Sequence, residues 1–282
     1  MVLVLIAALS MALLFAMFKV FDRREIPMLP AIVVNYFTAF ACGAALTQPW
    51  SWETMVPLLP SACLLGVLFI SIFYLSAIST QRIGVAVTAV ASKMSLVVTV
   101  LFAVIALGER PSMLGWSGIV LALVAVFASS WNPGAGNAKR AWLLPVLLFF
   151  GTAAVDITLN SVQRSQLSPT TESLFPTMVF GIAGVLGCTI MVVSRTAHHV
   201  LRSRVLIGGM VLGSINYASL YFIVGALARS GFEASSVFPL MNIGVILFGT
   251  AISILAFGER LRRLQWIGIA CAVFAMALIL LG

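Results

Sequence analysis

The sequence carries very little charge. Of its 282 residues only 9% are Asp, Glu, Lys or Arg, whereas a soluble globular chain has about 25%. Hydrophobic residues make up 62% of the chain, and the mean hydropathy is +1.15. A water-facing surface cannot be built from 8 acidic and 16 basic side chains at this length. The composition therefore excludes a soluble enzyme, a DNA-binding protein and a disordered chain, and it indicates an integral membrane protein.

A basic tract that could clamp nucleic-acid phosphates is also missing, although the net charge is +8. The basic residues stand singly or in twos and threes between apolar runs, which is where membrane topology places them. We therefore expect the lipid bilayer, and no nucleic acid, among the partners.

Motifs for metals, cofactors and catalysis are absent as well. The four cysteines lie in apolar runs without a CxxC pair, and we interpret them as small buried residues: Cys42, Cys63, Cys188 and Cys271. The pair His198–His199 lacks a third ligand for zinc. Neither a Walker A pattern nor an HExxH or Ser/His/Asp pattern occurs. We predict no enzyme, no metal and no cofactor.

The chain has many long apolar runs. A membrane-spanning helix needs about 20 mostly apolar residues. We predict ten such spans, at roughly 1–18, 28–48, 56–79, 83–107, 113–130, 141–162, 172–193, 205–228, 234–257 and 263–281. The first run lacks a basic segment and a cleavage site, so we expect a retained helix and not a signal peptide. The predicted fold class is an all-α integral membrane protein.

The chain repeats itself after 150 residues. The pattern AxGERxxxLxWxGIxxAxxA covers 106–125 and 256–275, with 10 identities between the two windows. The two triplets are Gly108, Glu109 and Arg110, and Gly258, Glu259 and Arg260. Chance matches of Ala, Leu or Ile are common in apolar sequence, but a Gly-Glu-Arg followed by Leu-x-Trp-x-Gly-Ile is not. The repeat therefore indicates an internal duplication.

The duplication divides the chain into two halves. We predict a first five-helix repeat over 1–130, a polar linker over 131–140 (WNPGAGNAKR) and a second five-helix repeat over 141–282. Because five is odd, the second repeat must enter the membrane in the opposite orientation. Inverted repeats are typical of secondary transporters, in which one part rocks against the other around a midplane site. This step from repeat to transport rests on architecture.

The two Gly-Glu-Arg segments resemble those of the drug/metabolite transporter superfamily, in its ten-helix EamA-type branch. The resemblance covers nearly the whole chain, through the helix count, the duplication, and the triplet between helices four and five and between nine and ten. It implies a permease for small organic solutes such as amino acids, other metabolites or drugs. It also implies a cavity lined by helices one, three, four, six, eight and nine, and proton coupling or exchange is common among such transporters.

Two arguments about orientation disagree. Loops after odd-numbered predicted helices hold 12 Lys and Arg residues, and loops after even-numbered ones hold 3. The positive-inside rule then places both termini outside, whereas the resemblance implies that both are cytoplasmic. In either orientation, we expect a multi-pass protein of the bacterial cytoplasmic (inner) membrane, as a monomer or homodimer.

Lys93 is the outstanding polar residue, because it lies near the centre of the fourth predicted span. A charged group at that depth costs about 2.5–3.5 kcal/mol on insertion scales. Each helix end is about 15 Å away at 1.5 Å per residue, so the side chain cannot easily reach the interface. We expect Lys93 to face the helix bundle, as a site for a substrate anion or a proton. A structural ion pair is the alternative.

Asp156 is the one acid well inside a predicted span, that over 141–162. We hypothesise that it pairs with Lys93 when the cavity is empty, and that substrate or a proton competes for one partner.

Other polar residues could complete a binding site. Asn242 on the ninth span is the repeat equivalent of Ser92, with Pro239 and Gly244 nearby to loosen the helix. Tyr74 and Tyr221 could each offer a hydroxyl and a ring. Interhelical hydrogen bonding and core packing are the alternatives for this group. Glycines at positions 181, 184, 187, 209 and 213 predict close helix packing.

For Glu109 and Glu259 we predict a structural role rather than catalysis or proton relay. Each follows a helix-ending glycine, and an acid near the start of the next helix is favoured by the helix dipole. We predict that Arg110 and Arg260 anchor the membrane interface.

The combined prediction is a secondary transporter for a small organic metabolite, such as an amino acid or other anion-bearing solute, by alternating access. Substrate would bind near Lys93, Asp156, Asn242, Ser92, Tyr74 and Tyr221. Multidrug or cation efflux is the alternative within transport, and it favours an acidic, aromatic cavity. An intramembrane enzyme would need more polar residues at the midplane than the chain has.

Overall fold

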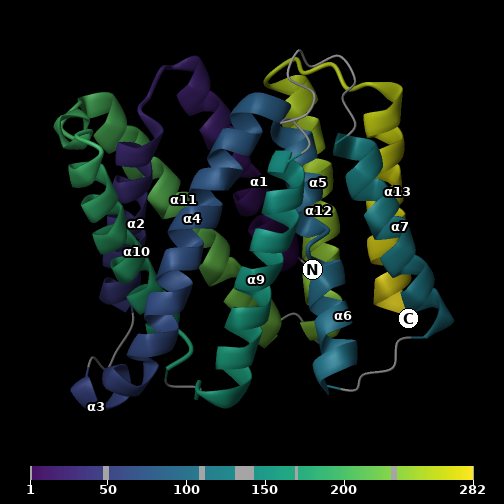
Figure 1. The fold of residues 1–282 in the computed structure, drawn as a ribbon, viewed down its shortest axis with the longest axis horizontal. Helices are drawn as coiled ribbons and strands as arrows, with labels where there is room; N and C mark the ends of the chain where they lie inside the picture. The colour runs from purple at the N-terminus through teal and green to yellow at the C-terminus, as the bar shows by residue number, and fades with distance from the viewer. Residues whose placement is uncertain are drawn as a thin grey trace. The chain divides into compact units, whose positions relative to one another are not determined.

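A computed structural model gives the fold of the chain (Figure 1). The structure describes residues 2–46, 51–107, 112–130, 143–168, 171–229 and 234–281. The first Gly-Glu-Arg triplet and the predicted linker over 131–140 lie outside these ranges.

The described residues form helices and no strand. The α-helices are α1 (Val2–Arg23), α2 (Met28–Leu46), α3 (Trp52–Met55), α4 (Leu59–Ile83), α5 (Val85–Lys93), α6 (Leu96–Leu107), α7 (Met113–Ser130), α9 (Leu143–Ser165), α10 (Leu174–Val193), α11 (Ser203–Arg229), α12 (Ala234–Leu255) and α13 (Arg263–Leu281). Two short 3₁₀ turns, Val56–Leu58 and Ala197–His199, complete the list.

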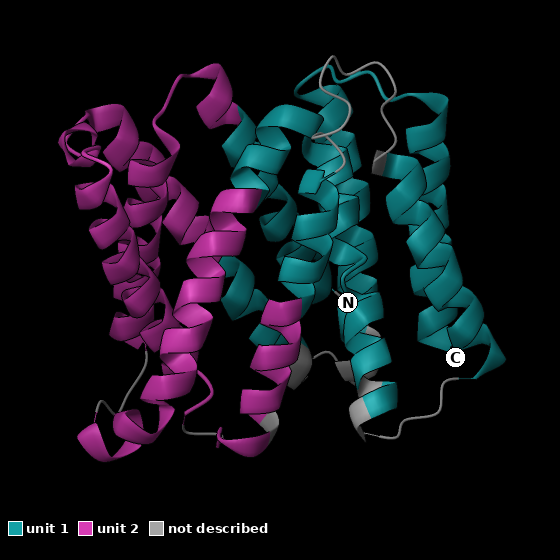
Figure 2. Ribbon diagram, viewed as in Figure 1, with its two compact units in different colours: residues 1–19, 76–153, 218–282 teal, residues 20–75, 154–217 magenta. Residues whose placement is uncertain are grey.

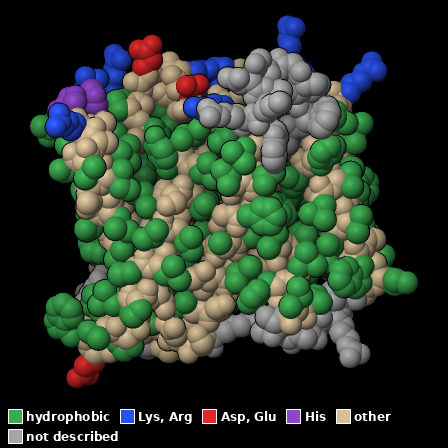
Figure 3. Space-filling model, in the orientation of Figure 1, with side chains coloured by type: hydrophobic (Ala, Val, Ile, Leu, Met, Phe, Trp, Pro, Cys, Tyr) green, Lys and Arg blue, Asp and Glu red, His purple; other side chains and the backbone are tan. Residues whose placement is uncertain are grey.

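These helices confirm the predicted fold class, an all-α membrane protein. Among the described residues, 9 helical segments are long and apolar enough to cross a membrane, and Met113–Ser129 is apolar but shorter. In Figure 3 hydrophobic side chains cover the helical surfaces in view, while Lys and Arg side chains lie at helix ends. This pattern matches side chains that meet lipid along the helix and water at its ends.

The span predicted over 83–107 is interrupted. Helix α5 ends at Lys93, and α6 begins at Leu96. The Ser95 hydroxyl donates to the Ser92 carbonyl at 2.6 Å, and the Val97 amide bonds three residues back, to Met94, at 3.0 Å. A serine side chain that bonds to nearby backbone competes with the regular helical ladder. The predicted span is therefore present, as Val85–Phe102 is long and apolar enough to cross a membrane, but it is built from two consecutive helices.

The described chain divides into two compact units (Figure 2). Unit 1 comprises residues 1–19, 76–153 and 218–282, and unit 2 comprises residues 20–75 and 154–217. Each unit takes segments from both predicted halves. This division follows contacts and not the sequence repeat, so the boundaries of the two repeats remain a prediction.

In unit 1, helices α7 and α13 pack side by side (Figure 1). A Cβ atom added to Gly118 would lie 2.9 Å from the Ala275 carbonyl oxygen. A Cβ atom added to Gly268 would lie 2.9 Å from the Ala125 carbonyl oxygen. Both pairs are related by the 150-residue repeat, so each helix presents the same glycine to the same position of the other. Only residues without side chains permit backbones to approach this closely.

The direction of these contacts gives the relative orientation of the two helices. Gly118 near the start of α7 also meets Ile279 near the end of α13, and Gly268 near the start of α13 meets Ser129 near the end of α7. The helices are therefore antiparallel and related by a local two-fold axis, as reciprocal contacts require. An inverted repeat requires α7 and α13 to be antiparallel in this way. The inversion of the two complete halves remains a prediction.

In unit 2, glycines bring α10 and α11 against α2. A Cβ atom at Gly181 would meet the ring of Phe40 at 2.9 Å, and one at Gly213 would meet the Asn35 carbonyl oxygen at 2.5 Å. The glycines at 184, 187 and 209 likewise face α2 residues. The close packing predicted for these five glycines is present.

The α7–α13 contact yields a stability prediction. In Gly268→Ala the new methyl group would lie 2.5 Å from the backbone nitrogen of Ser129, which cannot rotate away. We expect the overpacking to lower the free energy of unfolding by about 1–3 kcal/mol, measured as a lower thermal unfolding midpoint in detergent. Gly225→Ala is the control, because its nearest neighbour would be Leu3 at 3.7 Å. Equal midpoints for both variants would contradict the packing argument.

Candidate functional site

Lys93 lies at the interruption of the fourth span, within unit 1. Residues Val85–Ser92 of α5 are buried, and Lys93 at the end of the helix is half-buried. Its Nζ atom donates to the sulfur of Met11 on α1 at 3.5 Å. A cation at the carboxyl end of a helix is favoured by the partial negative charge there. The helix end thus offsets part of the cost of placing an ammonium group at this depth.

Three helices of unit 1 meet around this residue. Helix α12 packs against α5, where a Cβ atom at Gly249 would lie 3.2 Å from the Ala89 methyl group. Helix α1 is equally close to α12, since a Cβ atom at Gly244 would lie 2.7 Å from the Ala8 methyl group. Lys93, carried by α5 and touching α1, therefore stands where α1, α5 and α12 come together.

The other predicted site residues are divided between the two units. Ser92 and Asn242 are buried in unit 1, on α5 and α12. Tyr221 is also in unit 1, but it is exposed and its ring packs edge-on against Phe222. Asp156, on α9, and the exposed Tyr74, on α4, lie in unit 2. The Lys93–Asp156 pair, like the site as a whole, remains a prediction.

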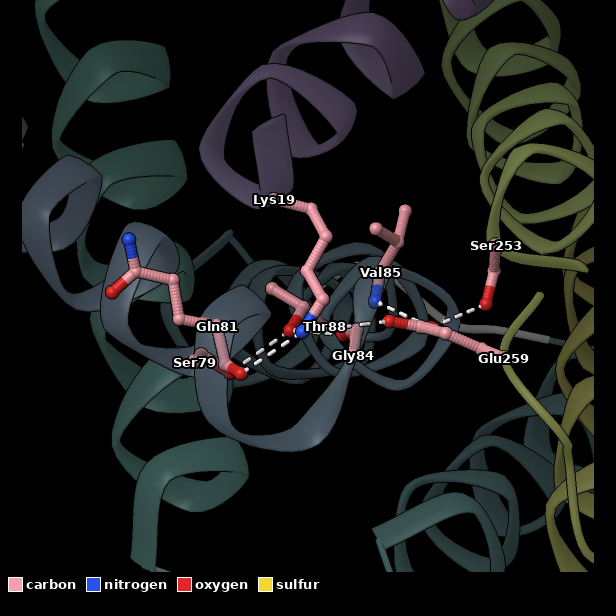
Figure 4. A network of polar contacts seen from close by, with 8 residues as sticks. All are labelled: Lys19, Ser79, Gln81, Gly84, Val85, Thr88, Ser253 and Glu259. Atoms are coloured by element: carbon pink, nitrogen blue, oxygen red, sulfur yellow. Dashed lines mark hydrogen bonds and ion pairs between the residues drawn. The ribbon is translucent and has the colours of Figure 1, made fainter. Parts of the chain in front are cut away.

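Among the described residues, Glu259 forms a polar network inside unit 1 (Figure 4). Its Oε2 atom accepts the backbone amide of Val85 at 3.2 Å and a short hydrogen bond from the Ser253 hydroxyl. Its Oε1 atom lies 3.9 Å from Nζ of Lys19, and that ammonium also donates to the Gln81 carbonyl at 3.2 Å. One carboxylate thus joins the end of α1, the start of α5 and the end of α12.

The helix that Glu259 meets differs from the expected one. We predicted an acid at the start of the following helix, but α13 begins only at Arg263 and has no acidic residue in its first turn. The carboxylate instead reaches the amino end of α5, 174 residues earlier. The N-cap of α5 is Gly84, which has no side chain to accept the free amide groups. Glu259 supplies that acceptor from elsewhere in the chain.

Gly84 is required at this position for two reasons. Its φ angle of +94° lies in the region that residues with a Cβ atom rarely adopt, and a Cβ atom would lie 2.6 Å from Oε2 of Glu259. Sequence analysis missed Gly84, Lys19 and Ser253, because the contacts that join them to Glu259 are not encoded by a local pattern.

Typical interaction free energies rank the contacts of Glu259. A hydrogen bond to a charged group is worth about 1.5–3 kcal/mol, and the helix dipole adds about 0.3–1 kcal/mol. The ion pair with Lys19 is long and both side chains are partly exposed, at 17% and 19%, so it contributes about 0–1 kcal/mol. The hydrogen bonds from Val85 and Ser253 therefore outweigh the ion pair with Lys19.

No group of three His, Cys, Asp or Glu residues in the described ranges could hold a metal ion. Lys93 and Ser92 lie on α5, and Asn242 lies on α12, which packs against α5.

Comparison with known proteins tests the resemblance to the EamA-type transporters. Residues 1–131 match the EamA-like transporter family. This match confirms the resemblance that the Gly-Glu-Arg segments indicated, and it covers the first predicted repeat. It points to a membrane transporter of the drug/metabolite superfamily, and so away from an enzyme.

Two further comparisons extend over most of the chain. An uncharacterized protein of Haemophilus influenzae (strain ATCC 51907 / DSM 11121 / KW20 / Rd) is 26% identical over 268 residues, which are 92% of this chain and 90% of that protein. A protein of known crystal structure has a TM-score of 0.57 and 14% sequence identity, over 98% of this chain and 95% of its own. This second likeness concerns the fold alone. The likeness to known proteins thus extends beyond the segment that matches the family model.

The cap on α5 yields a prediction with a matched control. Gly84→Ala meets both a disfavoured φ angle and the Glu259 carboxylate, whereas Gly258→Ala meets only a disfavoured φ of +65°, with open space around the new methyl group. An unfavourable φ costs about 1–2 kcal/mol. We expect Gly84→Ala to lower the thermal unfolding midpoint clearly more than Gly258→Ala. If Gly258→Ala is equally or more damaging, the carboxylate contact is not what requires glycine at position 84.

Proposed function

We propose that this protein is a secondary active transporter that moves a small organic metabolite bearing an anionic group, such as an amino acid, across the cytoplasmic membrane by alternating access. The observation that carries the proposal is the half-buried Lys93 at the interrupted span. An ionisable residue inside a membrane span is rare and typically functional. Transporter sites typically lie at midplane, where helices are broken.

In the proposed site, the Lys93 ammonium group binds the substrate anion. Ser92 and Asn242, at equivalent positions of the two repeats, donate hydrogen bonds that orient the solute. Asp156 pairs with Lys93 when the cavity is empty, and substrate or a proton then competes for one partner. Tyr74 and Tyr221 contribute from α4 and α11. Proton coupling through the Lys93–Asp156 pair fits the same set of groups, because a buried lysine changes its protonation readily.

Efflux of hydrophobic cations is the second candidate within the same superfamily. A cation pump needs acidic and aromatic groups in the cavity, whereas the charged group at the break is a lysine. Repulsion between Lys93 and a cationic drug argues against this candidate. The exposed aromatic residue Tyr221 is the feature that favours it.

A binding screen tests the anion site. We expect an anionic metabolite to raise the thermal unfolding midpoint of the detergent-purified protein, because a ligand at 100 times its dissociation constant stabilises the native state by about 2.7 kcal/mol. Lys93→Met should abolish this shift. Lys139→Met, the same substitution in the predicted linker, is the control and should keep it. A hydrophobic cation that binds equally well to wild type and Lys93→Met would contradict the anion site and favour drug efflux.

A further inference from the structure

Helix α5 connects the two charged groups described above. It has 9 residues, which gives a length of about 13.5 Å at 1.5 Å per residue. Its first amide, that of Val85, binds Glu259, and its last residue is Lys93. The cap and the candidate binding residue therefore stand at opposite ends of one short helix.

The helix between them is closely packed. All residues from Val85 to Ser92 are buried, and they pack against α12 and α7. Its core residues Ala86 and Val90 belong to one cluster with Ile246 and Ile269. A closely packed helix moves as a rigid body, so a displacement of its amino end reaches its carboxyl end.

The two ends of α5 differ in how they are held. At the carboxyl end, the regular α-helical ladder is interrupted at Met94–Ser95, where the Val97 amide bonds three residues back, to Met94. At the amino end, Glu259 accepts the Val85 amide, while Ser253 and Lys19 hold the carboxylate in place. The amino end is therefore the anchored one.

We propose that Glu259 is a positioning residue for Lys93: by anchoring the amino end of α5, it sets where the ammonium group stands among α1, α5 and α12. The role given to Lys93 rests on the proposed function, but the positioning itself does not. The contact of Glu259 with α5 is at Val85, the end of the helix opposite Lys93.

The experiment observes Lys93 directly, in the purified full-length protein. The chain has three lysines, Lys19, Lys93 and Lys139, so protein grown with lysine labelled at ¹³Cε gives three NMR signals, which Lys→Arg variants assign. In Glu259→Gln we expect the Lys19 signal to move, because the two side chains are in contact. We expect the Lys93 signal to move by more than its line width, through α5.

Two further variants separate position from charge and folding. Ser253→Ala removes one contact of the carboxylate but keeps its charge, so a smaller shift of the Lys93 signal in the same direction reports displacement of α5. Glu172→Gln, at an exposed acid of unit 2, should move neither signal. If Glu259→Gln does not fold, Ser253→Ala alone decides.

The proposal would be overturned if the Lys19 signal moves in Glu259→Gln but the Lys93 signal stays unmoved in both Glu259→Gln and Ser253→Ala. A Lys93 signal that moves only in Glu259→Gln would also overturn it, because the effect would then be one of charge. If the Lys93 signal moves in both variants while Lys93→Met binds anions normally, the positioning stands and the proposed anion site fails.

Discussion

The placement of helix α5 is the constraint on which the rest of unit 1 depends. Eight of its nine residues are buried, and its neighbours α7 and α12 pack directly on it. Both ends of such a helix carry unsatisfied backbone groups that lipid cannot hydrogen-bond. A carboxylate meets the amino end, and the ammonium group of Lys93 lies at the carboxyl end. Each charge thus complements the helix dipole, so that ionised groups become tolerable beside an apolar core.

The contact between α7 and α13 follows the sequence duplication, whereas the candidate site lies where the two halves of the sequence differ. The α7–α13 contact is symmetrical, since Gly118 and Gly268 take equivalent positions. The fourth and ninth spans are not, because α5 and α6 are separated while α12 runs unbroken from Ala234 to Leu255. The repeat equivalent of Lys93 is Ile243. The two halves thus differ at this position, where only the first carries a lysine.

The sequence predicted the features that depend on local composition. Apolar runs of about 20 residues revealed the spans, and the lysine inside one of them identified the candidate site. The Gly-Glu-Arg triplets indicated the resemblance to EamA-type transporters, which the match over residues 1–131 supports, because they form a spaced pattern in the sequence. Contacts between distant segments were beyond this reasoning: nothing near Glu259 shows that its carboxylate caps a helix 174 residues away. The interruption at Met94–Ser95 was also missed, because it depends on one serine bonding backwards.

Flux measured in liposomes tests most directly the claim that Lys93 makes this protein a carrier of anionic solutes. Purified wild type and Lys93→Met would be reconstituted at equal density, and counterflow of radiolabelled amino acids and other small anions followed in each. At least one anion should exchange in wild-type liposomes above the protein-free background, and Lys93→Met should show none. Equal exchange by both proteins would contradict the account, and Lys93 would then be a structural residue of the bundle.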